Sequence, residues 1–286
     1  IVVHYGSMLL IPIKTPLLQS GDDLASILIR TGLIQKGDII AISSKAIATA
    51  EGRMIDLQTI RPTAEAEEWS KRCGGSPVFC QAVLDETKRL HGTILPGCPQ
   101  AMLTELKPDG LNEGTILVAN AGLDESNVKE GFCIGWPEDA VESVRRLRQE
   151  LMKGLGMKKI QRIQKIQRSD SFESFEFSES FESSPAIIIT DSTCRPRRQG
   201  VTAQALVVSG FDPLRSLVGT RDLFGKKLRM TQEAVADQLA TAANMLMDNA
   251  GESVPAVIIR NHGISFTTFE GWVPGIEAAA DLFHGL

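Results

Sequence analysis

Four oxygen-bearing side chains follow apolar stretches at two places in the chain. Asp124 and Asn127 lie in the segment VANAGLDESNV, and Asp191 and Ser192 follow the apolar run at residues 186–190. Side chains placed directly after a strand can bind ligands, because the strand fixes the loop while the side chains stay free. Carboxylate, hydroxyl and amide oxygens are the ligands that Mg2+ or Mn2+ takes when it bridges the phosphates of a nucleotide. The two segments therefore suggest a metal-nucleotide site.

Three arginines come shortly after the second of these segments. Arg195, Arg197 and Arg198 carry planar guanidinium groups, which commonly bind phosphate or carboxylate. Simpler structural roles stay open for every one of these groups. Asp124 can close an Asx-turn, Asp191 can cap a helix, and the arginines can belong to a solvated loop. Together, the two oxygen-rich segments and the arginine cluster favour a ligand site over three unrelated turns.

Ser44 and Lys45 end another apolar run, at residues 38–43, where a hydroxyl and an ammonium can meet phosphates or simply end a strand. The chain has no Walker P-loop and no dinucleotide-binding glycine fingerprint, so any phosphate site must be built from other groups. It also has no nucleophile elbow and no protein-kinase motif set. Asn249 and Glu252 follow a predicted helix, where an amide oxygen can complete a metal shell or cap the helix.

The composition is that of an ordinary globular protein and limits its partners. Hydrophobic residues make up 43% of the 286 residues, and the net charge of -5 argues against non-specific nucleic-acid binding. No apolar run approaches the roughly 18 residues that cross a membrane. The five cysteines contain no C-x-x-C pair, which favours reduced thiols in a cytoplasmic protein over a disulfide framework or a zinc knuckle. We expect small-molecule partners, no nucleic acid and no membrane.

Alternating apolar segments predict the elements that must hold these side chains. Strands are expected at residues 9–13, 38–43, 115–119, 186–190, 201–208 and 257–260. Helices are expected from a cap at Asp22 or Asp23 to residue 30, at 64–73, 80–90 and 137–153, and from a cap at Thr231 to residue 247. The strands are spaced too irregularly for a simple Rossmann repeat. The sequence therefore predicts an α+β fold of mixed sheets with helices, in two lobes.

A low-complexity segment divides the chain. Residues 160–168 repeat an Ile-Gln-basic pattern, and residues 169–184 hold only Ser, Glu, Phe and Asp. Such a composition cannot bury enough apolar area to offset the entropy of ordering, which predicts a mobile insertion at 154–184. A partner-binding arm anchored by its phenylalanines is the alternative. The insertion separates an N-terminal α+β lobe, 1–153, which holds part of the site, from a C-terminal part, 185–286, which completes it.

Six segments, spread over nearly the whole chain outside the insertion, resemble those of a known enzyme family. In chain order they are IPIKTPLLQSGDDL, GDIIAISSKAIATAEGR, VANAGLDESNV, ITDSTCRPRRQGVT, GTRDLFGKKL and DQLATAANMLMDNAGESVPAVIIR. The parts ANAGLDESN, EGR and D-x-x-x-RP-x-R-x-G are fairly specific to that family. It is the family of γ-glutamyl ligases that build the deazaflavin coenzyme F-420.

The resemblance implies a GTP-dependent amide ligase that works as an intertwined homodimer of a mixed α+β fold, with ATP left open as the nucleotide. The nucleotide would phosphorylate the acceptor carboxylate, and the amino group of L-glutamate would then displace phosphate from the acyl phosphate. Mg2+ or Mn2+ would neutralise the γ-phosphate. Matching motifs imply metal ligands at Asp124, Asp191, Ser192 and Asn249, catalytic roles for Asp124, Asp191, Arg195 and Arg198, and a nucleotide site lined by Ile11, Pro12, Ile13, Lys14, Ser44, Lys45, Asn127, Met247, Asp248, Asn249 and Glu252.

Several positions depart from the family pattern. Residues 111–114 replace an Arg-His-Gly, Arg197 replaces a tryptophan, Thr49 a lysine, and Asn249 a longer glutamine. Compared with the family pattern, residues that can recognise the acceptor differ more than the implied metal ligands and catalytic residues. The acceptor is therefore expected to be coenzyme F-420-0 or a folate, which also presents a glutamate γ-carboxylate beside a planar heterocycle. The alternatives are a catalytically inactive nucleotide- or cofactor-binding homologue and a scaffold that acts through the insertion.

Overall fold

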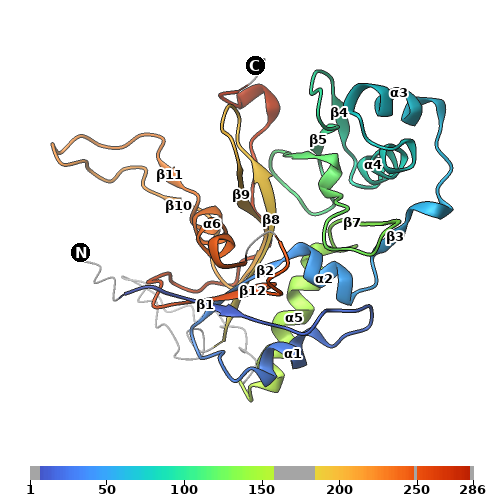
Figure 1. The fold of residues 1–286 in the computed structure, drawn as a ribbon. Helices are drawn as coiled ribbons and strands as arrows, with labels where there is room; N and C mark the ends of the chain where they lie inside the picture. The colour runs from blue at the N-terminus through green and yellow to red at the C-terminus, as the bar shows by residue number, and fades with distance from the viewer. Residues whose placement is uncertain (1–6, 158–183, 248–249, 284–286) are drawn as a thin grey trace, which may run out of the picture.

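The centre of the fold is a mixed sheet of six strands in the order β1, β12, β2, β8, β9 and β13 (Figure 1). The computed structural model describes residues 7–157, 184–247 and 250–283. β2 and β8 run parallel, while the other neighbouring strands are antiparallel. The strands are β1 Leu9–Ile13, β2 Ile39–Ser43, β8 Ala186–Cys194, β9 Val201–Ser209, β12 Ala256–Arg260 and β13 Glu270–Trp272.

Both faces of this sheet are covered, which explains why its central strands are uninterrupted apolar runs. In β2, Ile40 and Ile42 point to one core while Ile39 and Ala41 point to the other, since successive side chains of a strand alternate between faces. All four are completely buried. The run IIAI is thus apolar because it has a core on each side.

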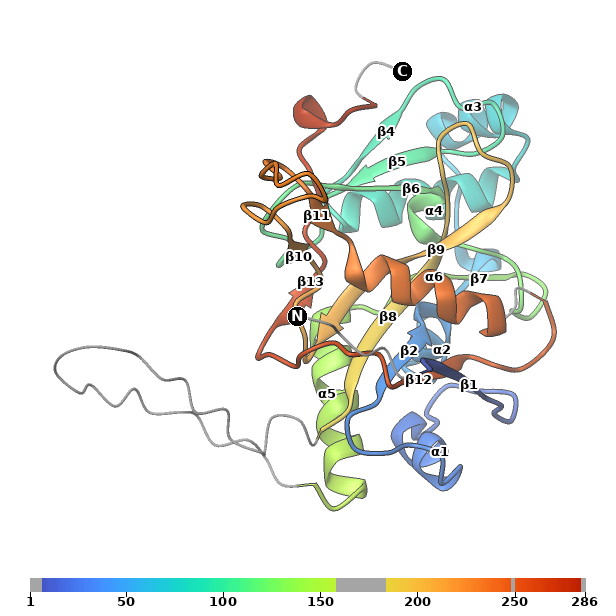
Figure 2. The ribbon, with the colours of Figure 1, turned by 90° about the vertical axis from the view of Figure 1, so that its left-hand side faces the viewer.

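Helices on the two faces complete these cores. On one face, α1 Leu24–Arg30 packs against α5 Ala140–Gly154, and Leu28 and Leu147 enter the core. α6 Val235–Met247 lies across the opposite face (Figure 2), where Leu239 is buried against the sheet. α2 Ser44–Ala50 follows β2 without an intervening loop. The helices therefore leave the ends of the strands, rather than their faces, as places for polar groups.

Residues 54–136 form a second group of elements, on the right of the sheet in Figure 1. Two of its strands pair with each other, three form a separate antiparallel sheet, and one of these, β6, contacts β8. The helix α4 packs on α3 and on the short turn η2. The elements are β3 Met54–Asp56, η1 Leu57–Thr59, α3 Ala64–Cys73, α4 Pro77–Arg89, β4 Thr93–Leu95, β5 Leu103–Leu106, β6 Ile116–Ala119, η2 Asn120–Gly122 and β7 Phe132–Ile134.

A long hairpin leaves the body between β9 and α6 and projects to the left in Figure 1. Its short strands are β10 Arg215–Ser216 and β11 Gln232–Glu233, and a final turn, η4 Ala278–Ala280, lies near the C-terminus. The helix start predicted at Thr231 is wrong. Thr231 belongs to the hairpin, where its carbonyl accepts from Leu217 N at 2.9 Å, and the helix begins at Val235. Cross-strand pairing keeps this stretch extended.

The predicted α+β fold of mixed sheets is confirmed. Two helix boundaries differ from the prediction because their caps lie outside the apolar pattern: Ser76 caps α4 and Asp139 caps α5, each accepting a backbone N–H three residues ahead. The division at residues 153 and 184 stays a prediction, and residues 158–183 of the insertion lie outside the described residues. No helix within the described ranges is long and apolar enough to span a membrane.

Candidate functional site

The end of β1, the end of β2, the start of β12 and the middle of β8 meet along one side of the central sheet, which is called the sheet edge below. Because β2 and β8 are parallel, Ser43, the last residue of β2, pairs with Thr190, so Ser44 and Asp191 come next to each other. The strand predicted at 186–190 is longer than expected: its pairing with β9 continues to Cys194, so Asp191 and Ser192 lie within β8 and not after it. Ser43 N donates to Pro255 O at 2.9 Å, and Thr15 N donates to Ser253 O at 3.1 Å, so the end of β1 and the start of β12 lie there too. The edge therefore gathers the predicted residues 11–14, 44–45 and 191–192, together with the loop of the predicted Glu252.

The ANAG part of the motif VANAGLDESNV is a turn with an unusual backbone. Asn120, Ala121 and Gly122 have φ values of 55°, 53° and 76°, in the left-handed region that costs a residue with a side chain about 1–2 kcal/mol. Asn120 Oδ1 accepts from Met102 N at 3.1 Å, and Ala121 N donates to Thr104 Oγ1 at 3.1 Å. These hydrogen bonds offset the strain and fix where the chain continues toward Asp124.

Asp124 is held through both its backbone and its side chain. Its backbone exchanges two hydrogen bonds of 2.9 Å with Ile134. Its carboxylate accepts from the Lys45 ammonium and from the Ser126 hydroxyl, the latter at 2.8 Å, and Lys45 Nζ also donates to Ser126 Oγ at 2.9 Å. Burial alone raises the pKa of the Asp124 carboxyl, but the hydrogen bonds from Lys45 and Ser126 outweigh it and hold the pKa below its usual value. Asp124 is therefore ionised at neutral pH.

Asp191 approaches the same ammonium from β8. It lies two residues beyond Ile189 and so points to the same face of the sheet. Trp136, which is 1% exposed, donates from Nε1 to Asp191 Oδ2 at 2.6 Å, and Ser192 N donates to Oδ1 at 2.9 Å. Burial raises the pKa of Asp191, against the lowering effect of these hydrogen bonds and of the Lys45 charge. Because Lys45 acts on both carboxylates, they share one cation.

The hydroxyl of Ser44 is the remaining oxygen of this centre. Ser44 is 1% exposed and its Oγ has no hydrogen-bond partner among the described residues, although it is near enough to Asp191 to favour the ionised carboxylate. A buried polar atom without a partner is uncommon and points to a group that the site binds. Two carboxylates and a hydroxyl are oxygen donors of the kind Mg2+ takes, with substrate phosphates and water completing its shell.

The donor set would depend on such outside ligands. Within residues 7–157, 184–247 and 250–283, no three His, Cys, Asp or Glu side chains form a ready metal cluster. Asn249, the fourth predicted ligand, lies outside the described residues together with Asp248. Ser192 and Asn127 are exposed beside the two carboxylates, and Asn127 has a left-handed φ of 56°. Their metal and nucleotide roles stay predictions.

The predicted nucleotide segment at the end of β1 is only partly exposed. Ile13 is completely buried, so only its backbone can face a ligand. Ile11 is half-buried, whereas Pro12 and Lys14 are exposed, and Lys14 offers an ammonium at the sheet edge. A ligand at this edge would therefore contact Pro12 and Lys14 rather than Ile13.

Two predicted nucleotide residues, Met247 and Glu252, lie on either side of residues 248 and 249, which are outside the described part of the chain. Met247 ends α6 and is buried, while Glu252 is exposed in the loop that leads to β12. Ser253, which has a left-handed φ of 56°, connects this loop to β1 through its carbonyl. The loop thus begins in the core and reaches the same edge as Lys45.

The predicted catalytic arginines lie further along the β8–β9 hairpin. β8 continues to Cys194, so Arg195 follows Asp191 by four residues, about 13 Å at the rise of an extended chain. Arg195 and Arg198 are exposed, and Arg195 Nε donates to Thr202 Oγ1 at 3.4 Å. Such a separation suits contact with the far end of a long acceptor, and the catalytic roles stay predictions.

Three residues of the centre were not predicted. Gly122 lacks room for a side chain, because a Cβ there would lie 2.6 Å from Trp136 Nε1. Trp136 is 55 residues from Asp191, and no motif connects positions so far apart. Ser126 N donates to Asp124 Oδ1 at 2.8 Å, and a serine two residues after an aspartate is a spacing that could have indicated this contact.

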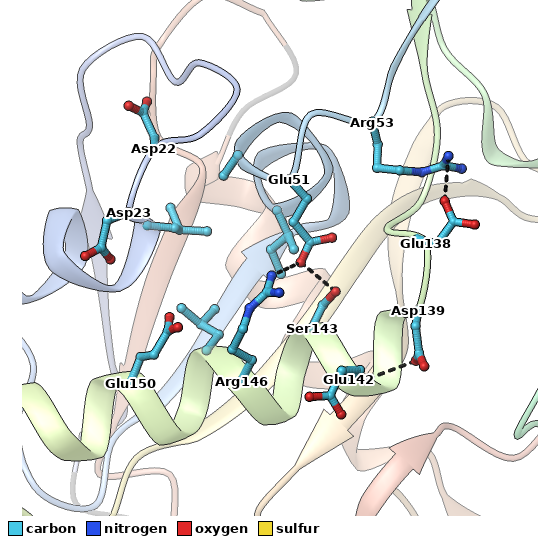
Figure 3. Close-up of a pocket in the computed structure, with 14 residues that line it drawn as sticks. Asp22, Asp23, Glu51, Arg53, Glu138, Asp139, Glu142, Ser143, Arg146 and Glu150 are labelled. Carbon is cyan, nitrogen blue, oxygen red and sulfur yellow. Dashed lines mark hydrogen bonds and ion pairs between the residues drawn. The ribbon is translucent and has the colours of Figure 1, made fainter.

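A cavity of about 620 Å³ opens elsewhere, between α1, α2 and α5 (Figure 3). Its two guanidinium groups are already paired, Arg53 with Glu138 and Arg146 with Glu51. An excess of carboxylates repels phosphates and carboxylate substrates, so we place the candidate site at the sheet edge. The acidic lining consists of Asp22, Asp23, Glu51, Glu138, Asp139, Glu142 and Glu150.

Comparison with known proteins gives the same family as the motifs. The sequence model of the F420-0:gamma-glutamyl ligase family matches residues 12–163 and 174–261. The coenzyme F420:L-glutamate ligase of Methanopyrus kandleri is 33% identical over 254 residues, which cover 89% of this chain and 86% of that protein. Those of Methanosarcina mazei and Methanocaldococcus jannaschii are 35% and 34% identical; the matches cover 86% and 91% of this chain, and 83% and 90% of the respective relatives.

These matches bear on two predictions. The resemblance drawn from the motifs is confirmed, and so is the prediction of an enzyme that forms an amide bond, at the level of the family. Asp124, Asp191 and Lys45 all lie within the matched ranges, so the centre at the sheet edge belongs to the shared part of the fold. The chain belongs to the F420-0:gamma-glutamyl ligase family.

Proposed function

We propose that this protein joins the amino group of L-glutamate to the carboxylate of an acceptor, using GTP and a divalent metal, through an acyl phosphate. The observation that carries the proposal is the convergence of Lys45, Asp124 and Asp191 around the buried, unpartnered hydroxyl of Ser44. Phosphoryl transfer depends mainly on positioning and on neutralising phosphate charge. A cation that acts on two carboxylates, with a buried hydroxyl beside them, suits that task.

Each residue of the centre has a task in this reaction. Asp124 and Asp191, with the Ser44 hydroxyl, would hold Mg2+ or Mn2+, which supplies charge neutralisation to the β- and γ-phosphates. The Lys45 ammonium, which has three donors, would hydrogen-bond a phosphate oxygen. Trp136 would keep the Asp191 carboxylate in place. In the first step the acceptor carboxylate attacks the γ-phosphorus and GDP leaves; in the second the glutamate amine attacks the acyl carbon, phosphate leaves, and the amine loses a proton.

The acceptor we propose first is coenzyme F-420-0, because the relatives are named coenzyme F420:L-glutamate ligases. A folate stays a second acceptor, since Arg195 and Arg198 are exposed further along the β8–β9 hairpin and can bind carboxylates at the far end of either molecule. GTP and free glutamate are cytoplasmic metabolites, which supports a cytoplasmic location. ATP enters as a comparison in the experiment.

We further propose that the protein is a homodimer and that its projecting hairpin, residues 214–233, contacts the second subunit. Leu223, Phe224 and Met230 on this hairpin are 100%, 95% and 87% exposed, which is costly for apolar side chains in water. Sedimentation of the protein and of Phe224→Ser tests this. The variant should shift toward monomer, and an unchanged dimer or a monomeric parent protein would contradict the proposal.

The reaction is tested by phosphate release together with mass spectrometry of the acceptor. Purified protein is given GTP or ATP, Mg2+ or Mn2+, L-glutamate, and either F-420-0 or a folate. Acceptor-dependent release with a mass gain of one glutamyl unit is expected, and Asp191→Asn should abolish it. Asp109→Asn, which alters an exposed carboxylate outside the centre, is the matched control. Protein that binds GTP yet releases no phosphate with either acceptor would instead be a binding homologue without catalysis.

A further inference from the structure

Two cysteines face each other at the junction between α3 and α4. Cys73 is the last residue of α3 and half-buried, and Cys80 lies in the first turn of α4 and is 1% exposed. Their sulfur atoms are 3.9 Å apart. Neither residue belongs to the centre at the sheet edge, and their sequence spacing is not that of a C-x-x-C motif.

The connection between the two helices keeps the two thiols close together. Gly74 ends α3 in the left-handed conformation, and Ser70 Oγ donates to Gly75 O at 2.6 Å. A Cβ on Gly75 would lie 3.4 Å from the sulfur of Cys80 and 3.8 Å from that of Cys73, so the loop lies directly over the pair. Ser76 caps α4 by accepting from Phe79 N at 3.2 Å. The loop is ordered by its own hydrogen bonds, with the sulfurs on its inner side.

A disulfide bond is about 2.0 Å long, so the two sulfurs must close by about 2 Å to join. Cys73 ends a helix, is partly exposed and precedes two glycines, and these features allow its side chain and the adjoining backbone to move. Cys80 is fixed within α4. Cys73 must therefore make most of this movement, and it is also the more exposed of the two residues.

We propose that Cys73 and Cys80 form a reversible oxidation site, which closes to a disulfide by exchange with a small disulfide such as oxidised glutathione. The Cys73 thiolate attacks one glutathione sulfur and the other glutathione leaves as a thiolate. The Cys80 thiolate then attacks the Cys73 sulfur and releases the second glutathione. Two electrons pass from the cysteine pair to glutathione disulfide, and the two thiol protons go to the departing glutathiones.

The order of these steps follows from the surroundings of the two thiols. Burial, assisted by the neighbouring Cys73, raises the pKa of the Cys80 thiol to about 12, so Cys80 is a poor first nucleophile at neutral pH. Cys73 reacts first because it is accessible. The second step is then intramolecular, and its rate should increase with pH as the Cys80 thiolate becomes more populated.

The test is peptide mapping of the folded protein after exposure to oxidised glutathione. Trypsin cleaves after Arg72 and Lys88, which leaves both cysteines in one peptide, 73–88. Chymotryptic cleavage after Phe79 then separates Cys73 from Cys80 unless a disulfide joins them. We expect fragments that stay joined until a reductant is added, with a loss of two hydrogen atoms. Cys194, which is exposed, should carry a glutathione adduct in the same sample and shows that the oxidant was active.

Two outcomes would overturn the proposal: fragments that separate without reductant, or a glutathione adduct that persists on Cys73. The thermal midpoint gives a second reading that needs no variant. Closing so short a loop should raise the midpoint by about 5 °C, and a reductant should reverse the rise. Cys73→Ser should show neither the link nor the rise, while Cys98→Ser, which changes a half-buried cysteine elsewhere, should show both.

Discussion

Replacing Gly122 with alanine tests whether the ANAG turn positions the Asp191 carboxylate. A Cβ at residue 122 would lie 2.6 Å from Nε1 and 2.7 Å from Cε2 of Trp136. Non-bonded carbon atoms prefer about 3.5–4.0 Å, so the indole must move by about 1 Å. Its hydrogen bond to Asp191 Oδ2, 2.6 Å long, would then stretch to a length at which hydrogen bonding is lost.

The expected cost has two parts. Alanine at a φ of 76° adds about 1–2 kcal/mol of backbone strain, and a buried hydrogen bond left unmade adds about 1–3 kcal/mol. Gly74→Ala is the matched control, because Gly74 has a φ of 75° and a Cβ there would meet nothing within 4 Å. It should carry the strain alone. The difference between the two variants therefore isolates the contact with Trp136.

Thermal unfolding and glutamate-dependent phosphate release measure the two effects. Gly122→Ala should melt about 2–10 °C below Gly74→Ala, and its turnover should fall about tenfold or more, since each 1.4 kcal/mol of lost transition-state stabilisation is a factor of ten. In combination with Trp136→Phe, which removes the indole donor, Gly122→Ala should cost less than it does alone. Equal midpoints and equal turnover in Gly122→Ala and Gly74→Ala would refute this reasoning.

Three further changes probe the charges of the fold. Lys45→Met removes the cation beside Asp124, so the pKa of the Asp124 carboxyl should rise, which NMR titration measures. Turnover should fall about a hundredfold or more. Lys36→Met, at an exposed position, should change neither the pKa nor the turnover. The folded-state pKa of Asp191 is raised above 3.8, so the folded protein binds this proton more tightly than the unfolded chain does. The free energy of unfolding therefore falls as the pH rises from 3.8 through the folded-state pKa. Asp191→Asn should therefore have a higher thermal midpoint than the parent protein at pH 7, and the difference should shrink toward pH 3.8. A lower midpoint at pH 7 would contradict the conclusion that burying the ionised Asp191 carboxylate destabilises the fold. Arg260 donates two hydrogen bonds of 2.8 Å to the buried Asp38 carboxylate. Arg260→Met leaves that charge without its cation and should lower the free energy of unfolding, measured by chemical denaturation, by about 3–5 kcal/mol. Adding Asp38→Asn should recover part of this loss, and a fully additive loss in the double variant would argue against the pairing.

The sequence alone predicts most of the helices and strands, because the patterns that indicate them involve neighbouring residues. The apolar run IIAI and the aspartate cap at Asp23 fix β2 and the start of α1 through interactions among neighbouring residues. The helix predicted from Thr231 failed for the opposite reason. There, an unforeseen strand pairing within the hairpin overrides a good capping residue.

The sequence also determined which residue types the site contains. The motifs identify Asp124, Asp191 and Lys45, and they place the chain in its family. The motifs do not show in which direction these side chains point or how far apart they lie. They assign Lys45 to the phosphates, but they do not show that its ammonium also pairs with Asp124, which is 79 positions away.

Only the tertiary structure decided how these residues form one centre. The parallel pairing of β2 with β8 sets Ser44 beside Asp191, and the left-handed turn at residues 120–122 carries Asp124 to the same edge. Trp136 reaches Asp191 only because residue 122 has no side chain. Local sequence preferences act over a few residues, whereas strand order, register and side-chain packing join residues that are far apart in the chain. The motifs therefore supply the residue types of the candidate site, and the fold sets their geometry.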